Sequence, residues 1–178
     1  MKLSSEAEAR YRVQDYSRPS GIGGVVLVDL RRFHDEAGSM TELARLEGGR
    51  VGGLEGFVAA QVNYSTLEPG GIKAFHVHRR QTDVWFVPPS DRVLLVLVDV
   101  REGSPTEGSR LRLTLGDGDS RLVRIPPGVA HGCRNIGGAT ARILYFTDVH
   151  FSAEPGATDE GRLPWDHFGA GLWESARD

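Results

Sequence analysis

The sequence lacks the features that mark disulfide-rich, membrane-spanning and nucleic-acid-binding proteins. One cysteine among 178 residues excludes an intramolecular disulfide framework and fits a reducing compartment. No apolar run approaches the roughly 20 residues that a membrane-spanning helix needs, and the start, MKLSSEAEAR, has no apolar centre of a secretion signal. The formal charge of -3 comes without the basic stripe of a nucleic-acid binder. We therefore expect a cytoplasmic protein that binds neither membranes nor nucleic acids.

Apolar, β-branched runs separated by glycine, proline and aspartate turns predict an all-β sandwich or barrel. The 23 glycines and 9 prolines are scattered between these runs, as in a protein with many turns. The stretch 31–38 is typical of a turn, and 47–56 is too rich in glycine for a helix or a strand. We expect a single domain over 1–178, with an N-terminal arm (1–22), a loop-rich C-terminal tail (150–178) and strands at 25–30, 56–67, 72–78, 84–87, 93–100, 110–115, 122–125 and 141–148.

Three histidines and one carboxylate form the candidate site. His76 and His78 are two residues apart, so on a strand both side chains point to the same face. Asp83 follows after a short polar connection, and His131 follows the Pro126-Pro127 pair. Imidazole nitrogens and a carboxylate oxygen can bind one divalent metal ion (Mn, Fe, Ni, Co or Zn). The alternative is a set of hydrogen-bonded cavity histidines without a metal.

A second polar face precedes these histidines in the chain. Gln61, Asn63 and Ser65 alternate with Val62 and Tyr64 along the expected strand 56–67. Polar side chains at every second position, next to the histidine strand, suggest the lining of the same cavity. The alternative is a half-exposed strand with its polar face in water.

The order of these residues resembles the two cupin motifs. HxH, four residues and an aspartate are followed by a distant PxGxxHxxxN. Asp83 stands where cupins usually carry glutamate, and Ser90 and Ser120 stand where they usually carry glycine. The resemblance implies a cupin-type jelly-roll β-barrel with short peripheral helices, and it implies His76, His78, Asp83 and His131 as metal ligands.

A more specific resemblance covers residues 35–173. The chain resembles the dTDP-4-dehydrorhamnose 3,5-epimerase family, itself a cupin-type jelly roll, through the runs QVNYS (61–65), IKAFH (72–76), VDVREGSPTEG (98–108), RIPPGVAHG (124–132), TDVHF (147–151) and GRLPWD (161–166). The resemblance implies a homodimer with β-sheets packed between the subunits. It also implies a substrate that is a nucleotide-linked 4-keto-6-deoxysugar. A plain epimerase of this kind requires no cofactor.

The same resemblance assigns roles to individual residues. His76 falls on the family's catalytic base, which removes a proton next to the keto group. A neutral imidazole suits that task near pH 7. Gln61, Asn63 and His131 match positions that contact the sugar or the diphosphate. Lys73 stands where the family has an arginine that grips the diphosphate, and it keeps the charge without the bidentate fork.

The sequence departs from the family pattern at positions that take part in the reaction. Asp83 falls where the family uses a lysine to stabilise the enolate. Aligned without gaps, the family's general-acid tyrosine falls on Leu144, and its neighbour Tyr145 would point to the opposite face of a strand. A small shift in the preceding turn would place Tyr145 in the site, so His76, Asp83 and Tyr145 are the catalytic candidates. The family's base-orienting aspartate lies in a C-terminal segment that this sequence does not match.

The nucleotide-binding turn of the family is matched only in part. DEAGSMTE (35–42) resembles this turn and makes Glu42 a candidate substrate contact. Ala37 stands in place of the family's arginine, and Met40 in place of its phenylalanine. We therefore expect thymidine recognition to differ from that of the family.

Three functions remain open from the sequence. We predict an epimerase-like isomerase that moves a proton next to a carbonyl of a nucleotide-linked keto sugar or a related keto compound, with His76 as base. The first alternative is a metal-dependent cupin enzyme, an isomerase, lyase, cyclase or oxygenase that uses His76, His78, Asp83 and His131. The second is a non-catalytic cupin that binds a small molecule.

Overall fold

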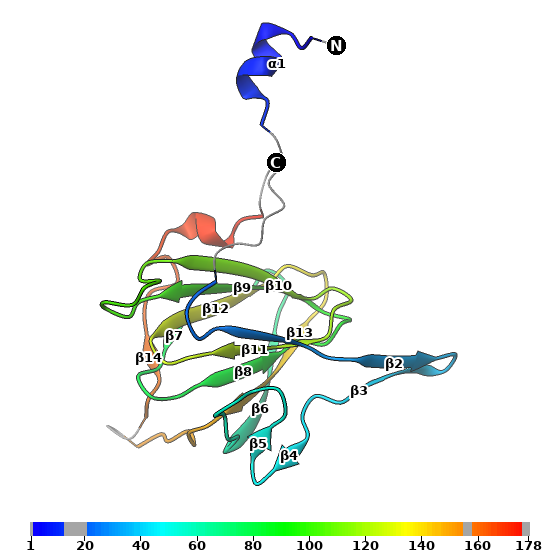
Figure 1. Cartoon of the computed structure of the whole chain (residues 1–178), viewed down its shortest axis with the longest axis vertical. Coiled ribbons are helices and arrows are strands. Elements are labelled where there is room, and N and C mark those ends of the chain that lie inside the picture. The colour runs from blue at the N-terminus through cyan, green and yellow to red at the C-terminus, as the bar shows by residue number, and fades with distance from the viewer. Residues whose placement is uncertain (1, 13–20, 155–157, 176–178) are drawn as a thin grey trace.

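Two antiparallel five-stranded sheets pack face to face (Figure 1). The computed structural model describes residues 2–12, 21–154 and 158–175. One sheet has the strand order β1-β11-β8-β13-β6, and the other has the order β10-β9-β12-β7-β14. The arrangement confirms the predicted all-β, cupin-type jelly roll.

The elements of the two sheets come from all along the chain. The first sheet contains β1 (Val26–Asp29), β6 (Gln61–Leu67), β8 (Asp83–Phe86), β11 (Arg121–Ile125) and β13 (Ala141–Thr147). The second contains β7 (Ile72–Val77), β9 (Arg92–Asp99), β10 (Arg110–Gly116), β12 (Val129–Asn135) and β14 (Gly161–Arg162). The smaller elements are the helix α1 (Ser5–Arg10), the hairpins β2 (Arg32–Asp35) with β3 (Gly38–Thr41) and β4 (Leu46–Glu47) with β5 (Arg50–Val51), and the 3-10 turn η1 (Ala170–Trp173).

The two short helical elements agree with the expected peripheral helices. The side chain of Ser4 caps α1 by accepting a hydrogen bond from the backbone N–H of Ala7, as serine does at helix starts. No helix in the described ranges is long and apolar enough to cross a membrane. Residues 13–20 of the expected arm, and 155–157 and 176–178 of the expected tail, lie outside the described residues, as does residue 1.

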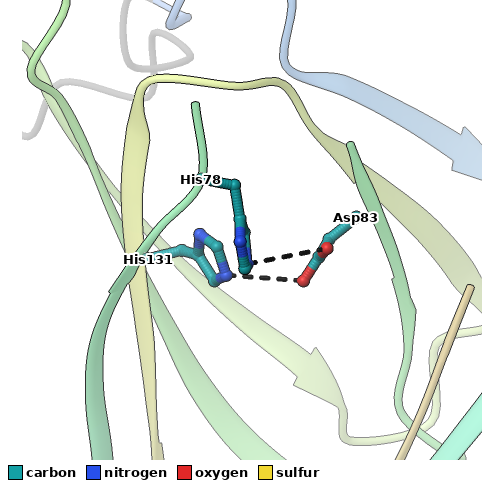
Figure 2. Close-up of side chains that lie close together, drawn as sticks. All are labelled: His78, Asp83 and His131. Atoms are coloured by element: carbon teal, nitrogen blue, oxygen red, sulfur yellow. Dashed lines mark ion pairs between the residues drawn. The ribbon is translucent and has the colours of Figure 1, made fainter. Parts of the chain in front are cut away.

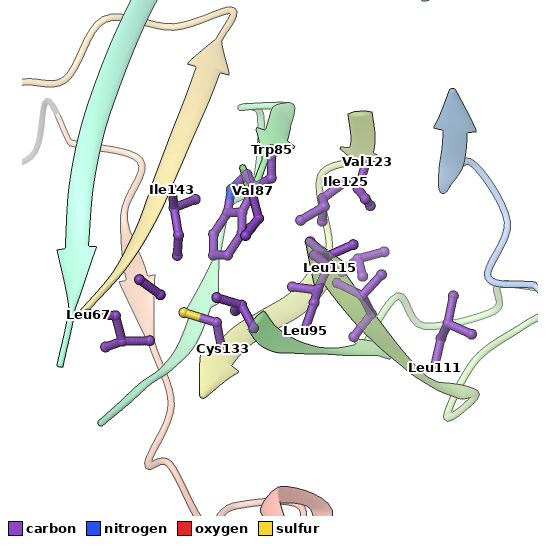
Figure 3. Close-up of a cluster of buried hydrophobic side chains, with 14 of the residues drawn as sticks. Leu67, Trp85, Val87, Leu95, Leu111, Leu115, Val123, Ile125, Cys133 and Ile143 are labelled. Atoms are coloured by element: carbon purple, nitrogen blue, oxygen red, sulfur yellow. The ribbon is translucent and has the colours of Figure 1, made fainter. Parts of the chain in front are cut away.

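Strand β9 is buried on both faces because its residues alternate between two apolar clusters. Val93, Leu95 and Leu97 face the interior between the sheets, where they join Leu115 and Ile125 (Figure 3). The alternate residues 94, 96 and 98 belong to an outer cluster that the C-terminal Trp173 covers. Burying each such side chain contributes about 1.5–3 kcal/mol, so the apolar run at 93–100 fixes the middle of the second sheet.

Three segments differ from the sequence-based expectation. β12 is a full strand between β7 and β9, although no strand was predicted at 129–135. The predicted turn at 31–38 is the β2–β3 hairpin, which extends away from the two sheets (Figure 1). The glycine-rich loop 47–56 contains β5 and places Val51 and Leu54 in an apolar cluster on the outer face of the first sheet.

The loop after β9 is organised by one buried carboxylate. Asp99, 1% exposed, accepts hydrogen bonds from the guanidinium and the backbone N–H of Arg101 and from the hydroxyls of Ser104 and Thr106. The bonds from Arg101, together with those from Thr106 and Ser104, hold the pKa of this carboxyl well below its usual range despite its burial. The REGSPTEG segment of the family-like motif therefore owes its shape to Asp99.

We expect Asp99→Ala to lower the free energy of unfolding by about 2–3 kcal/mol, because it leaves two partly buried hydroxyls and a guanidinium without their acceptor. Urea denaturation followed by circular dichroism measures this change. Asp29→Ala is the matched control, since Asp29 is exposed in its pair with Arg121, and the expected change is below about 0.5 kcal/mol. Equal effects of the two substitutions would contradict the structural role of Asp99.

Candidate active site

A cavity of about 490 Å³ lies between the sheets. Its walls come from β6, β8 and β13 of the first sheet, from β7 and β12 of the second, and from the segment 158–162. The size is typical of a small-molecule site. The cavity brings together nearly all predicted site residues: Gln61, Asn63, Lys73, His76, His78, Asp83, His131 and Tyr145.

Strand β6 turns its polar face inward. Gln61, Asn63 and Ser65 line the cavity, and Gln61 Nε2 donates to Asn63 Oδ1 at 2.7 Å. The alternate residues Val62 and Tyr64 point outward and are 54% and 62% exposed. The interpretation of this polar face as a cavity lining is therefore confirmed, and among the described residues the apolar outer face of the strand is exposed.

His76 and His131 face each other because β7 and β12 pair in that register. The two residues are direct partners across the strands, and their rings stack with centroids 5.8 Å apart. On the outer side of the same strands, a Cβ at Gly132 would lie 2.3 Å from the Cβ of Ala74. Glycine at 132 therefore permits the close approach of the strands that sets the two histidines side by side.

His78, Asp83 and His131 form a buried cluster on the cavity wall (Figure 2). Asp83 Oδ2 lies 3.4 Å from His131 Nε2, and Asp83 Oδ1 lies 3.9 Å from His78 Nε2. Burial raises the pKa of Asp83, but the hydrogen bond with His131 and the charges of His131 and His78 outweigh it, and the pKa falls to about 2. Asp83 is therefore a carboxylate near neutral pH.

The segment 158–162 adds an edge strand to the second sheet and reaches the site. β14 pairs with β7, which sets Arg162 opposite His76. The side chain of Asp159 accepts hydrogen bonds from three successive backbone N–H groups, at residues 79–81. Glu160 Oε1 lies 3.2 Å from His76 Nδ1. A carboxylate therefore stands beside the candidate base, although the sequence predicted that this chain lacks the family's base-orienting residue.

The environment of His76 favours the neutral imidazole. Burial is the largest cause that lowers the pKa of His76, followed by the positive charges of His131 and Arg162, and Glu160 offsets part of the effect. The resulting pKa is about 4. A neutral ring whose Nδ1–H is held by a carboxylate has its Nε2 lone pair available to accept a proton.

Tyr145 lies in the cavity and Leu144 does not. Tyr145 lines the cavity with its ring centroid 6.1 Å from that of Trp85, whereas Leu144 packs into the outer apolar cluster. Burial raises the pKa of Tyr145, and the negative charges of Asp83 and Glu160 raise it further. The phenol therefore keeps its proton near neutral pH and can act as a proton donor.

The dTDP-4-dehydrorhamnose 3,5-epimerase family model matches residues 19–170 of the chain. The chain belongs to this family. The spore coat polysaccharide biosynthesis protein SpsL of Bacillus subtilis (strain 168) is 39% identical over 145 residues, which are 82% of this chain and 91% of that protein. Family membership makes the protein an isomerase-type enzyme, and epimerases of this family need no cofactor.

Solved structures of family members share the fold. A dTDP sugar isomerase from Desulfovibrio desulfuricans G20 superposes with a TM-score of 0.70 at 29% identity, over 87% of this chain and 91% of that chain. NovW, a 4-keto-6-deoxy sugar epimerase from the novobiocin biosynthetic gene cluster of Streptomyces spheroides, superposes with a TM-score of 0.70 at 27% identity, over 86% of this chain and 76% of that chain.

One predicted site residue lies apart from the cavity. Glu42 follows β3, is exposed, and pairs with Arg45 at 2.9 Å. It is not among the cavity residues, because the hairpin that precedes it extends away from the sheets (Figure 1). Within one chain, the structure therefore does not place the predicted nucleotide-binding turn at the site.

Some residues of the cavity were not predicted from the sequence. Gln81, Asp159, Glu160 and Arg162 line the cavity, and none was a candidate. Three of them belong to the segment 158–162, where the motif GRLPWD was the only available signal. Burial raises the pKa of the cavity residue Cys133 to about 12, which favours a small buried residue over a nucleophile.

Proposed function

We propose that the protein epimerises a nucleotide-linked 4-keto-6-deoxysugar, with His76 as the base. The observation that carries the proposal is the placement of His76 in the cavity, where the carboxylate of Glu160 lies 3.2 Å from His76 Nδ1. The donated Nδ1–H leaves Nε2 to take the proton from the carbon next to the keto group. The name of NovW as a 4-keto-6-deoxy sugar epimerase supports the substrate class, and a role in deoxysugar biosynthesis follows from it.

The reaction removes one proton and returns one to the opposite face of the same carbon. His76 takes the first proton and becomes an imidazolium, and the electron pair of the broken C–H bond moves onto the keto oxygen as an enolate. The phenol of Tyr145 supplies the second proton as the enolate collapses to the ketone. Tyr145 stands on β13 of the first sheet and His76 on β7 of the second, so the two act from opposite walls of the cavity.

Two cations in the cavity suit the diphosphate of a nucleotide sugar. Lys73 and Arg162 both line the cavity. Arg162 lies opposite His76 on the neighbouring strand, and Lys73 Nζ donates to the backbone carbonyl of Thr66 at 3.1 Å. A lysine binds phosphate as a point charge, whereas an arginine offers a bidentate fork. We propose that these two side chains hold the diphosphate, and that Gln61, Asn63 and His131 contact the sugar.

Incubation with a dTDP-linked 4-keto-6-deoxyglucose in D2O tests the function. We expect deuterium at the carbons beside the keto group, detected by mass spectrometry, and a loss of about 10²–10⁴-fold in rate for His76→Ala, the usual contribution of a general base. His167→Ala is the matched control, because His167 is exposed outside this cavity. Absence of exchange with every keto-sugar nucleotide, or wild-type exchange by His76→Ala, would refute the proposal.

Glu160 is proposed as a positioning residue for His76. Removing a carboxylate that orients a functional histidine typically costs 10–100-fold. We expect Glu160→Ala to lower kcat by about that factor with little change in KM, and Glu160→Asp to recover part of the rate. Glu154→Ala, at an exposed position, should leave both parameters unchanged. A rise in KM with an unchanged kcat would show that Glu160 serves substrate binding and not the base.

We also propose that the protein forms a homodimer through the outer face of β6. Val62 and Tyr64 are exposed there, and apolar side chains on an open sheet face mark association surfaces. We propose that in such a dimer the β2–β3 hairpin reaches the second copy and brings Glu42 to a nucleotide bound there.

We expect Val62→Asp to convert the protein from two chains to one, because the new charge would be buried without a partner at the interface. Light scattering after size-exclusion chromatography measures the molar mass. Thr114→Asp adds the same charge at an exposed position on the other sheet and should leave the dimer intact. A wild-type protein of one chain mass would show that this face has another role.

A further inference from the structure

The hydrogen bonds of His78 and His131 fix which ring nitrogen carries a proton. His78 Nδ1 lies 3.0 Å from the carbonyl oxygen of Asp159, and His131 Nδ1 lies 3.0 Å from that of Val129. A carbonyl oxygen only accepts hydrogen bonds. Both Nδ1 atoms therefore donate, and both Nε2 atoms are left to face Asp83.

Asp83 already has a donor on each of its oxygens. Gln81 Nε2 donates to Oδ1 at 2.8 Å, and Trp85 Nε1 donates to Oδ2 at 3.1 Å. The amide of Gln81 also lies 3.4 Å from His78 Nε2. Because an N–H group points at it, His78 Nε2 presents a lone pair and not a proton. The second lone pair of each Asp83 oxygen remains directed toward the imidazoles.

With both Nδ1 atoms donating to carbonyls, the Nε2 side of the cluster has to supply positive charge to Asp83. Either a proton on Nε2, which makes an imidazolium, or a metal ion between the groups supplies that charge. We propose that His78 Nε2, His131 Nε2 and the carboxylate of Asp83 bind a divalent transition-metal ion. This inference is independent of the proposed epimerisation. It also differs from the four-residue set predicted from the sequence, because His76 is paired with Glu160 instead.

The dimensions of the cluster suit such an ion. Bonds of about 2.0–2.2 Å place neighbouring ligand atoms roughly 3–3.5 Å apart, and Asp83 lies 3.4 Å from His131 Nε2 and 3.9 Å from His78 Nε2. The three ligand atoms all lie within 4.8 Å of one another, and the three residues are 6%, 3% and 2% exposed in chain order. Small inward shifts of the side chains would complete the coordination.

The ligand types select the class of metal. Two imidazoles and one carboxylate favour Zn²⁺, Fe²⁺, Co²⁺ or Mn²⁺ over Ca²⁺ and Mg²⁺, which prefer sites made of oxygen alone. Each Nδ1–H donates to a backbone carbonyl, and histidines that bind a metal usually make such a bond because it fixes the orientation of the ring. Three protein ligands leave a coordination position open toward the cavity. An ion there can polarise a carbonyl oxygen, at the position where other family members carry a lysine.

Co²⁺ binding tests the proposal, because its visible absorption reports nitrogen and oxygen ligands directly. The full-length chain without a histidine tag is treated with EDTA, dialysed and titrated with CoCl2 by calorimetry and absorption spectroscopy. We expect one equivalent of Co²⁺ per chain, with visible bands and a raised melting temperature. Asp83→Asn and His78→Gln should each weaken binding at least 100-fold.

Three further variants make the result specific. Trp85→Phe keeps all three ligands and removes one hydrogen-bond donor to Asp83, so we expect it to weaken Co²⁺ binding by about 10-fold. This variant keeps the test informative where a ligand variant fails to fold. Cys133→Ser and His150→Ala change other cavity residues and should bind Co²⁺ as the wild type does.

Two results would overturn the proposal. Binding of less than a tenth of an equivalent by the wild type would mean that an imidazolium, and not a metal, balances the charge of Asp83. Unchanged binding by Asp83→Asn and His78→Gln would place the ion elsewhere. Neither result depends on turnover, so both are separate from a failure of the proposed epimerisation.

Discussion

The close approach of β12 to β7 is the constraint on which the site depends. β12 is hydrogen-bonded on both sides, to β9 and to β7, and Gly132 meets Ala74 where any larger residue would collide. This contact sets His131 opposite His76 on the inner face. Because β9 is buried between two apolar clusters, β12 cannot shift away from β7 without disturbing the core.

The C-terminal segment supplies the second part of the site. Asp159 binds the turn 79–81 through three backbone N–H groups, and its own carbonyl accepts from His78. Its neighbour Glu160 contacts His76. The two residues that precede β14 thus contact two histidines of the site. The segment before β14 therefore places a carboxylate beside the candidate base.

The sequence predicted the residues that local patterns reveal. The alternation at 61–65 predicted a polar cavity wall, the apolar run at 93–100 predicted a strand covered on both faces, and the HxH spacing predicted two histidines on one side. β12 escaped prediction because glycine and polar residues interrupt its apolar pattern. Glu160 escaped because its contact with His76 joins segments far apart in the chain. Glu42 was placed in the site by resemblance alone, and the hairpin before it points elsewhere.

The two carboxylates of the site, Glu160 and Asp83, have different surroundings that suit them to different roles. Glu160 is partly exposed and reaches a single ring nitrogen of His76, which suits the orientation of a base. Asp83 is buried among two imidazoles, an amide and an indole N–H, which suits the binding of a cation. Asp83, at the position that the resemblance assigns to a lysine, therefore favours a positive charge beside it.

A crystal structure with a non-reactive dTDP-sugar would show whether the cavity holds the sugar of a nucleotide sugar against His76. We expect the carbon that exchanges its proton at about 3–3.5 Å from His76 Nε2, the distance of a reactive contact, with the diphosphate at Lys73 and Arg162. A sugar bound outside the cavity, or one whose carbons lie beyond reach of His76, would contradict this expectation.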